Sequence, residues 1–116
     1  MENQYNAALE FIERAGPVSF VDLEKQHPWM FEKGSELGIR CQTIPNLWMW
    51  VGMSSEGIAF FEHPETIKRI EPTEASYQAY AYDGKAPGLP LAGNDMTLEG
   101  YAEPHWLPTN WIARHA

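Results

Sequence analysis

The stretch YNAALEFIERAGPVSFVDLEKQHP, residues 5–28, carries the strongest local signals for the fold. Its apolar side chains recur at the three-to-four-residue spacing of one helix face: Tyr5, Ala8, Leu9 and Ile12. This spacing predicts a helix that packs one face against a core. Gly16-Pro17 ends the helix, because glycine supplies a left-handed cap and proline cannot continue the hydrogen-bond pattern.

A second helix is predicted over about residues 20–26. The Ser19 hydroxyl can accept from the first-turn N–H groups, and Asp22, three residues on, completes a variant capping box. His27-Pro28 then opens a third short segment through residue 33, because proline suits the first helical position.

A β-hairpin is predicted over residues 39–62. Leu47–Val51 is apolar on both faces, which indicates a strand covered on both sides, with Trp48 and Trp50 pointing the same way. The cluster Ser54-Ser55-Glu56-Gly57 is typical of a turn, and it feeds a second strand at 58–61.

The rest of the chain is richer in proline, glycine and aromatic residues. Pro64 and the basic pair Lys68-Arg69 suit the two ends of a short helix. The expected elements are a helix at 64–70, a helix or a strand over 73–82, a loop at 84–95, a weak strand at 96–101, an extended arm at 104–108 and a last turn at 110–114. We expect the tryptophans of this tail to pack onto the open face of the hairpin, although tryptophan also anchors protein interfaces.

The order of helix, capped second helix, third segment and hairpin over residues 4–62 resembles a winged helix-turn-helix. The resemblance implies an α+β fold. The length of 116 residues is that of one domain, residues 1–116, in which residues 63–116 form a C-terminal extension. In that family the third helix enters the DNA major groove and the hairpin tip contacts the backbone or the minor groove.

The charge of the chain argues against nucleic acid as a partner. Lys and Arg number 8 against 16 Asp and Glu, a net charge of -8, and each half of the chain carries -4. The segment 28–40 has no net charge and the tip 54–57 carries only Glu56, so both expected DNA contacts lack cations. A protein or a small ligand is the expected partner.

The location of the protein follows from what the sequence lacks. It has no apolar run long enough to span a membrane and no signal-peptide pattern at Met1, so we expect a cytoplasmic protein without membrane contacts. Its single cysteine forms no internal disulfide.

Enzyme motifs are absent, and we expect no catalytic residue, metal or cofactor. The cluster Glu62-His63-Pro64-Glu65 suits acid–base chemistry or metal binding, but a helix start explains it better. The other histidines, His27, His105 and His115, are interpreted as non-ligating. Cys41 is either an activated thiol beside Arg40 or, as we favour, a buried inert cysteine.

Two functions are compatible with these features. The first is a non-enzymatic acidic protein-binding module that occupies the cationic, nucleic-acid-binding surface of a host protein. Phage-encoded inhibitors such as the anti-CRISPR proteins are similar in size and charge. Its candidate contact residues are Glu32, Glu36, Trp48, Trp50, Glu56 and Phe61.

The alternative is a winged-helix transcriptional regulator that binds DNA. It requires the cations to gather on one face of the molecule despite the overall charge. The cations concerned are Lys25, Lys33, Arg40, Lys68 and Arg69.

Overall fold

The computed structural model describes residues 3–93 and 97–114, and it confirms the α+β class. The helices are α1 (Asn3–Ala15), α2 (Phe20–Gln26), the 3-10 turn η1 (Pro28–Met30), α3 (Ser55–Glu62), α4 (Pro64–Arg69) and α5 (Tyr77–Asp83). The strands are β1 (Val18–Ser19), β2 (Gly38–Arg40), β3 (Leu47–Val51), β4 (Ile70–Glu74), β5 (His105–Trp106) and β6 (Thr109–Ala113). In these two ranges, no helix has the length and apolarity that crossing a membrane requires.

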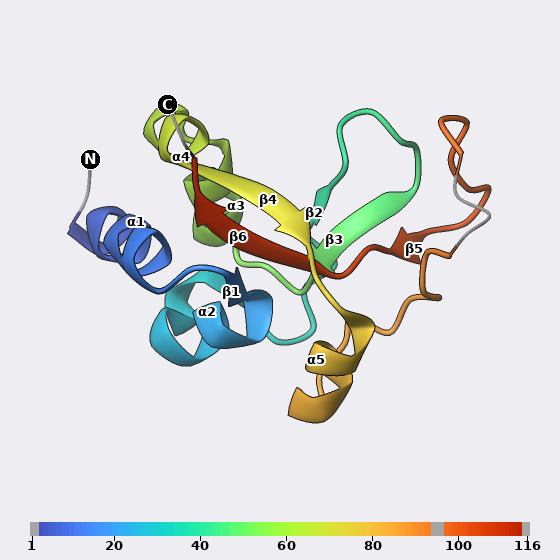
Figure 1. Ribbon diagram of the computed structural model, residues 1–116, viewed down its shortest axis with the longest axis horizontal. Helices are drawn as coiled ribbons and strands as arrows, with labels where there is room; N and C mark the ends of the chain where they lie inside the picture. Colours follow the sequence, from blue (N-terminus) through green and yellow to red (C-terminus); the bar gives the residue numbers. More distant parts are fainter. Residues whose placement is uncertain (1–2, 94–96, 115–116) are drawn as a thin grey trace.

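The strands form two three-stranded sheets, with orders β1-β6-β4 and β2-β3-β5 (Figure 1). β6 is the central strand of the first sheet and runs antiparallel to both neighbours, whereas β3 and β5 pair in parallel. The last turn predicted at 110–114 is therefore wrong. Residues 109–113 form a strand because β1 and β4, which come from distant parts of the chain, supply its hydrogen-bond partners.

The first two helices are confirmed. The Ser19 side chain accepts from the Asp22 N–H and the Asp22 carboxylate accepts from the Ser19 N–H, both at 3.0 Å, so the predicted capping box is present. The end of α1 differs from the prediction, because Gly16 does not take the left-handed conformation. Glycine is needed there for space: a Cβ atom would lie 2.7 Å from the Ile12 carbonyl oxygen and 3.0 Å from that of Trp111.

The predicted second strand of the hairpin, 58–61, is wrong, because these residues lie in α3. The Ser54 hydroxyl accepts from the Gly57 N–H at 3.0 Å and caps this helix. A Cβ atom at Gly57 would overlap the Met30 carbonyl group, so glycine allows α3 to approach η1. The serines and the glycine that suggested a turn thus serve as a helix cap and a close backbone contact.

The actual hairpin joins β2 to β3 through residues 41–46. Its register shifts: Ile39 pairs with Trp50 and Arg40 with Trp48, so Met49 has no partner in β2. The third segment is only a 3-10 turn, and β1 pairs with β6. This arrangement of elements gives no recognisable winged helix.

The core is aromatic, and the tail contributes to it as expected. The ring of Phe20 stacks on that of Trp50 at a centroid distance of 5.3 Å and meets Trp111 edge-on at 6.1 Å. Trp106 is buried, and its Nε1 donates to the Met49 carbonyl oxygen at 3.2 Å. The two halves of the chain therefore share one core.

The other C-terminal expectations have mixed outcomes. The helix starting at Pro64 is confirmed as α4. Residues 77–83 are helical, with Ser76 as the cap, and the left-handed Gly84 ends this helix. The strand predicted at 96–101 is not seen at 97–101, where Gly100 N–H donates to the Thr97 carbonyl in a turn; Met96 lies outside the described residues, as do residues 94 and 95 of the predicted loop.

Candidate functional site

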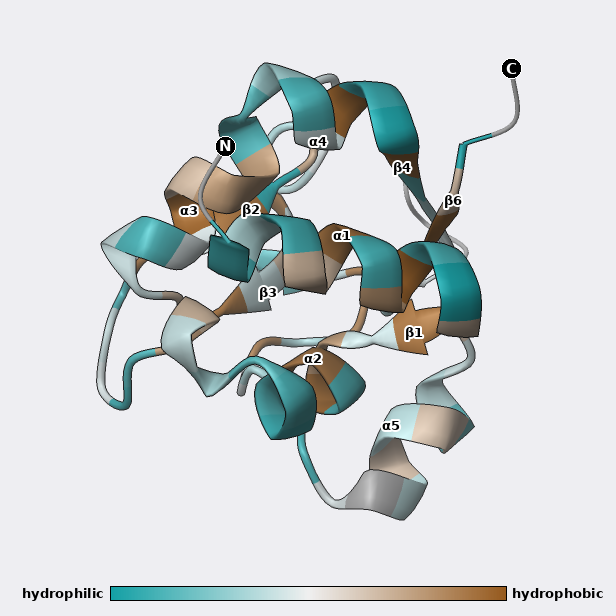
Figure 2. Cartoon of the chain, turned by 90° about the vertical axis from the view of Figure 1, so that its left-hand side faces the viewer, coloured by the Kyte–Doolittle hydropathy of each residue, from teal (hydrophilic) through white to brown (hydrophobic). Residues whose placement is uncertain are grey.

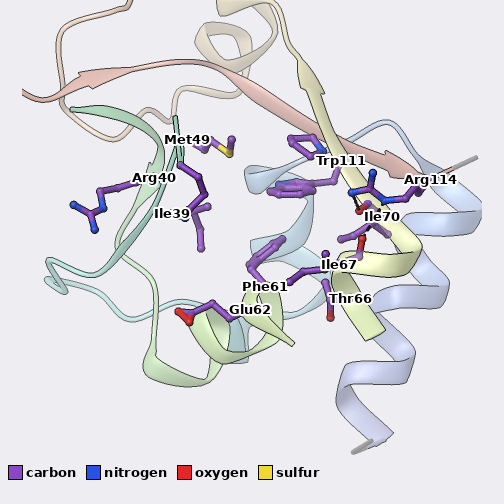
Figure 3. Close-up of a pocket in the computed structure, with 12 residues that line it drawn as sticks. Ile39, Arg40, Met49, Phe61, Glu62, Thr66, Ile67, Ile70, Trp111 and Arg114 are labelled. Carbon is purple, nitrogen blue, oxygen red and sulfur yellow. Dashed lines mark hydrogen bonds between the residues drawn. The ribbon is translucent and has the colours of Figure 1, made fainter. Parts of the chain in front are cut away.

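A groove of about 500 Å³ opens where the two sheets face each other (Figure 3). One wall comes from β2 and β3, and the other from α3, α4, β4 and β6. We call it the inter-sheet groove. The residues that line it are Ile39, Arg40, Gln42, Met49, Phe61, Glu62, Thr66, Ile67, Ile70, Pro72, Trp111 and Arg114.

The interior of the groove is apolar. Figure 3 shows Ile39 and Met49 on one side and Ile67 and Ile70 on the other, with Trp111 between them. The ring of Trp111 packs on that of Phe61 with centroids 4.7 Å apart. A second hollow of about 360 Å³, which also reaches Gly38 and Ile58, shares residues with this groove and extends it. Such dimensions match those of small-molecule sites, about 300–1,000 Å³.

Two buried polar atoms of the groove lining have no hydrogen-bond partner among the described residues. One is Nε1 of Trp111, a residue that is 7% exposed, and the other is the hydroxyl oxygen of Thr66, a residue that is 1% exposed. A buried donor without a partner costs about 1–3 kcal/mol, and such groups are rare in native proteins. Nε1 of Trp48 shares this property, but Trp48 does not line the groove.

The charged groups of the groove lining lie at its rim. Arg114 is engaged: it donates to the Glu71 carboxylate at 3.1 Å and to the Ile67 and Ile70 carbonyls at 3.0 and 3.2 Å. Arg40 and Glu62 form no ion pair within the described chain, and Figure 3 shows both side chains pointing away from Trp111. The guanidinium of Arg40 lies 5.5 Å from the centre of the Trp48 ring.

A second feature is an acidic cluster on α1 and α4, two helices that lie on the same side of the molecule (Figure 2). Glu13 binds the Arg69 guanidinium through two hydrogen bonds, at 3.2 and 2.5 Å, and Glu10 and Glu65 also act electrostatically on Arg69. The hydrogen bond from Arg69 lowers the pKa of the Glu13 carboxyl, against a smaller effect of burial. We call Glu10, Glu13 and Glu65 around Arg69 the α1–α4 acidic cluster.

The basic residues predicted for DNA contact are dispersed. Arg69 lies within the acidic cluster, and Lys68 pairs with Glu65 at 3.7 Å. Lys25 lies in the last turn of α2, Lys33 follows η1, and Arg40 ends β2. The adjacent basic pair is thus surrounded by carboxylates and forms no free cationic patch.

The six residues predicted for protein contact also fall in separate places. Trp50 is 7% exposed and is a core residue, so it lacks the exposure of an interface anchor. Trp48 is half-buried under Arg40, and Phe61 forms part of the groove floor.

The three glutamates of that set lie on other elements. Glu56 is in the first turn of α3, where its carboxylate accepts from the Gln4 amide at 2.7 Å. Glu32 lines a different hollow, of about 610 Å³, together with Lys33 and Trp50, and Glu36 is exposed in the loop before β2.

The described histidines make contacts within the fold. Nδ1 of His63 accepts from the Glu65 N–H at 3.1 Å and caps α4, which agrees with the interpretation as a helix start. His105 stacks on Tyr101 with ring centroids 3.7 Å apart, and His115 lies outside the described residues. His27 packs beside Phe11, and burial lowers its pKa. Across 3–93 and 97–114, no group of three or more potential ligands is placed to hold a metal ion.

The expectation of a buried Cys41 is wrong. This residue lies half-exposed in the loop after β2, and its Sγ is 3.5 Å from the Thr43 hydroxyl oxygen. Burial raises its pKa, but hydrogen bonds from the Thr43 hydroxyl and from the N–H groups of Thr43 and Ile44 outweigh it, so the net pKa of the Cys41 thiol is lowered.

The groove was missed in the sequence because its walls come from segments far apart in the chain. Ile39, Ile67 and Trp111 each follow an ordinary apolar pattern of their own element. Thr66 carries no local signal either, since a threonine inside a short helix is unremarkable. Only the packing of α4 and the two sheets brings these side chains together.

No protein-family model matches the chain, and no curated protein or solved structure is significantly similar to it. Its function is therefore inferred from the chemistry of its own residues.

Proposed function

We propose that this protein is a non-enzymatic, acidic protein-binding module that occupies the cationic surface of a nucleic-acid-binding protein. The observation that carries the proposal is the α1–α4 acidic cluster, in which the one adjacent pair of cations is already bound by carboxylates. Carboxylates displayed on a compact fold can replace nucleic-acid phosphates in a cationic groove. Inhibitors encoded by phages or mobile elements, such as the anti-CRISPR proteins, belong to this class of acidic protein ligand.

The distribution of ion pairs supports an excess of negative charge at the surface. The ion pairs within the described chain engage Lys68, Arg69, Lys85 and Arg114. These pairs engage 4 of the 8 basic residues and 4 of the 16 acidic ones, so 4 cations and 12 carboxylates stand outside them. The remaining carboxylates include exposed ones on α1 and α3, at Glu10, Glu56 and Glu62.

The test compares two variants of equal net charge. The first carries Glu10→Gln, Glu13→Gln and Glu65→Gln, which removes the acidic cluster. The matched control carries Glu74→Gln, Glu99→Gln and Glu103→Gln, all exposed residues away from α1 and α4. Each protein is used to capture partners from bacterial lysate at about 50 mM and about 500 mM salt, because screening weakens contacts between exposed charges.

The proposal expects nucleic-acid-binding proteins to be captured at the lower salt by the unmodified protein and by the control, but not by the cluster variant. Capture should be lost for all three at the higher salt. Recovery of no nucleic-acid-binding protein, or equal loss in both variants, would contradict it.

The winged-helix DNA-binding regulator remains a second hypothesis and has less support. It needs Lys68 and Arg69 as phosphate contacts, and both are held by carboxylates. A filter-binding assay with duplex DNA at about 50 mM salt, where counterion release favours binding, decides it: absence of any affinity eliminates this function.

A further inference from the structure

We propose that the inter-sheet groove binds a small, uncharged apolar molecule that carries a hydrogen-bond acceptor, such as a carbonyl oxygen. This inference goes beyond the proposed function and does not depend on it. The acidic cluster and the groove share no residue, and the two predict different ligands.

The shape and the lining of the groove support an apolar ligand. Its volume of about 500 Å³ lies between side chains of the two sheets and of α4, chiefly Ile39, Met49, Ile67, Ile70 and Trp111. Ile67 is exposed at its edge although it is a large aliphatic residue. A ligand that covers these side chains removes apolar surface from water, at about 25 cal/mol per Å².

The unpartnered donors specify the polar part of the ligand. The indole N–H of Trp111 can only donate, and the hydroxyl of Thr66 lies on the same lining without a partner among the described residues. The Trp111 Nε1 and the Thr66 hydroxyl oxygen are both buried, so the side chains of the lining must shift slightly for a ligand to reach either atom. An acceptor oxygen that bonds the indole N–H removes the cost of leaving that donor unsatisfied.

The charged residues of the lining favour a neutral ligand. Arg114 is already engaged by the Glu71 carboxylate and by two carbonyl oxygens. Arg40 and Glu62, of opposite charge, both point away from the interior (Figure 3). A charged group placed among the isoleucines would lose its hydration without gaining a partner, which is strongly unfavourable.

The test uses two probes of nearly equal shape, 2-acetylnaphthalene, which has a carbonyl acceptor, and 2-isopropylnaphthalene, which has none. Each is titrated into the ¹⁵N-labelled protein while the indole N–H resonances of the 5 tryptophans are followed by NMR. The ketone should bind roughly three- to tenfold more tightly than the hydrocarbon, the value of one net hydrogen bond. It should also shift the Trp111 indole proton downfield, which the hydrocarbon should not do.

The control is another tryptophan with a buried, unpartnered Nε1 that lies outside the groove, Trp48. Trp111→Phe should abolish the preference for the ketone, whereas Trp48→Phe should keep it. Thr66→Val, which keeps the shape of the side chain, should reduce the preference without preventing hydrocarbon binding. If Trp111→Phe does not fold, the Trp111 indole shift in the unmodified protein decides the question.

Any of the following results would overturn the proposal. They are absence of saturable binding of either probe, equal affinity for the two probes in the unmodified protein, and chemical-shift changes centred on the hollow beside Trp50 and Lys85. Equal losses of ketone preference in Trp111→Phe and Trp48→Phe would also contradict it, because the effect would then not arise in the groove.

Discussion

The hydroxyl of Tyr80 donates a hydrogen bond to the carbonyl oxygen of Thr109 at 2.7 Å. The same hydroxyl accepts from the Phe20 N–H at 2.9 Å. Tyr80 is only 1% exposed, and its ring packs edge-on against Trp106 at 5.1 Å. One side chain of α5 thus joins the start of α2 to the start of β6, through backbone groups that water does not reach.

Replacement of this hydroxyl should destabilise the fold. Tyr80→Phe leaves the buried Phe20 N–H without this acceptor and the Thr109 carbonyl without this donor. We therefore expect the free energy of unfolding to fall by about 2 kcal/mol. Urea denaturation followed by tryptophan fluorescence measures it. Tyr82→Phe on the same helix is the control, since Tyr82 is 92% exposed and its change should have almost no effect. Equal effects of the two would show that the buried hydrogen bonds contribute nothing.

Gly57 gives a prediction in which the sign of the change is decisive. In an unconstrained helix, glycine to alanine stabilises by about 1 kcal/mol. Here the new Cβ atom would overlap the Met30 carbonyl group, so Gly57→Ala should instead destabilise by about 1–3 kcal/mol. Denaturant titration gives the free energy of unfolding and so distinguishes stabilisation from destabilisation. A gain in stability would rule out the close packing of α3 on η1.

The pH dependence of stability should reflect His27. Burial lowers its pKa below the usual 6.5, so the unfolded chain takes up this proton first as the pH falls. Its contribution to stability is complete above about pH 6.5 and is lost as the pH falls through the lowered pKa. His27→Gln should therefore flatten the decrease in unfolding free energy below pH 6.5. A slope that His27→Gln leaves unchanged, or a His27 midpoint at or above 6.5 by NMR titration, would contradict this expectation.

Cys41 should react as an activated thiol. Its alkylation by iodoacetamide reports on this residue alone, because the chain has 1 cysteine. The hydrogen bonds of the loop favour the thiolate, so the pH midpoint of the reaction rate should lie below the ordinary thiol value of about 8.5.

The contribution of Thr43 can be separated from that of the loop backbone. Thr43→Val removes the hydroxyl that lies 3.5 Å from Sγ and should raise the midpoint of the alkylation rate. Thr73→Val, on β4, is the control and should leave it in place. If both variants gave the midpoint of the unmodified protein, the Thr43 hydroxyl would have no role in stabilising the thiolate.

Elements whose signals lie within a few residues were predictable. The apolar spacing of α1, the Ser19–Asp22 capping box and the proline that starts α4 all appear in the structure. The position at which α1 ends was predicted correctly, but the reason for it was not. Gly16 is needed for its close contact with Trp111, a residue far away in the sequence.

Elements that depend on distant partners were mispredicted. Ser54 and Gly57 suit a turn as well as a helix cap, and the approach of Met30 selects the helix. Thr109–Ala113 becomes a strand because β1 and β4 flank it on both sides. Local propensity is a weak preference that such tertiary contacts override.

The composition and the order of the residues are sufficient to predict the acidic net charge, the first two helices, the role of His63 as a helix start and the burial of the tail tryptophans. They are not sufficient to predict the groove or the acidic cluster around Arg69. Helix caps and apolar periodicity act over one or two turns, so they can be read along the chain. The groove and the cluster instead join side chains that only the pairing of remote strands and helices brings within contact distance, as Glu13 with Arg69 and Ile39 with Trp111 show.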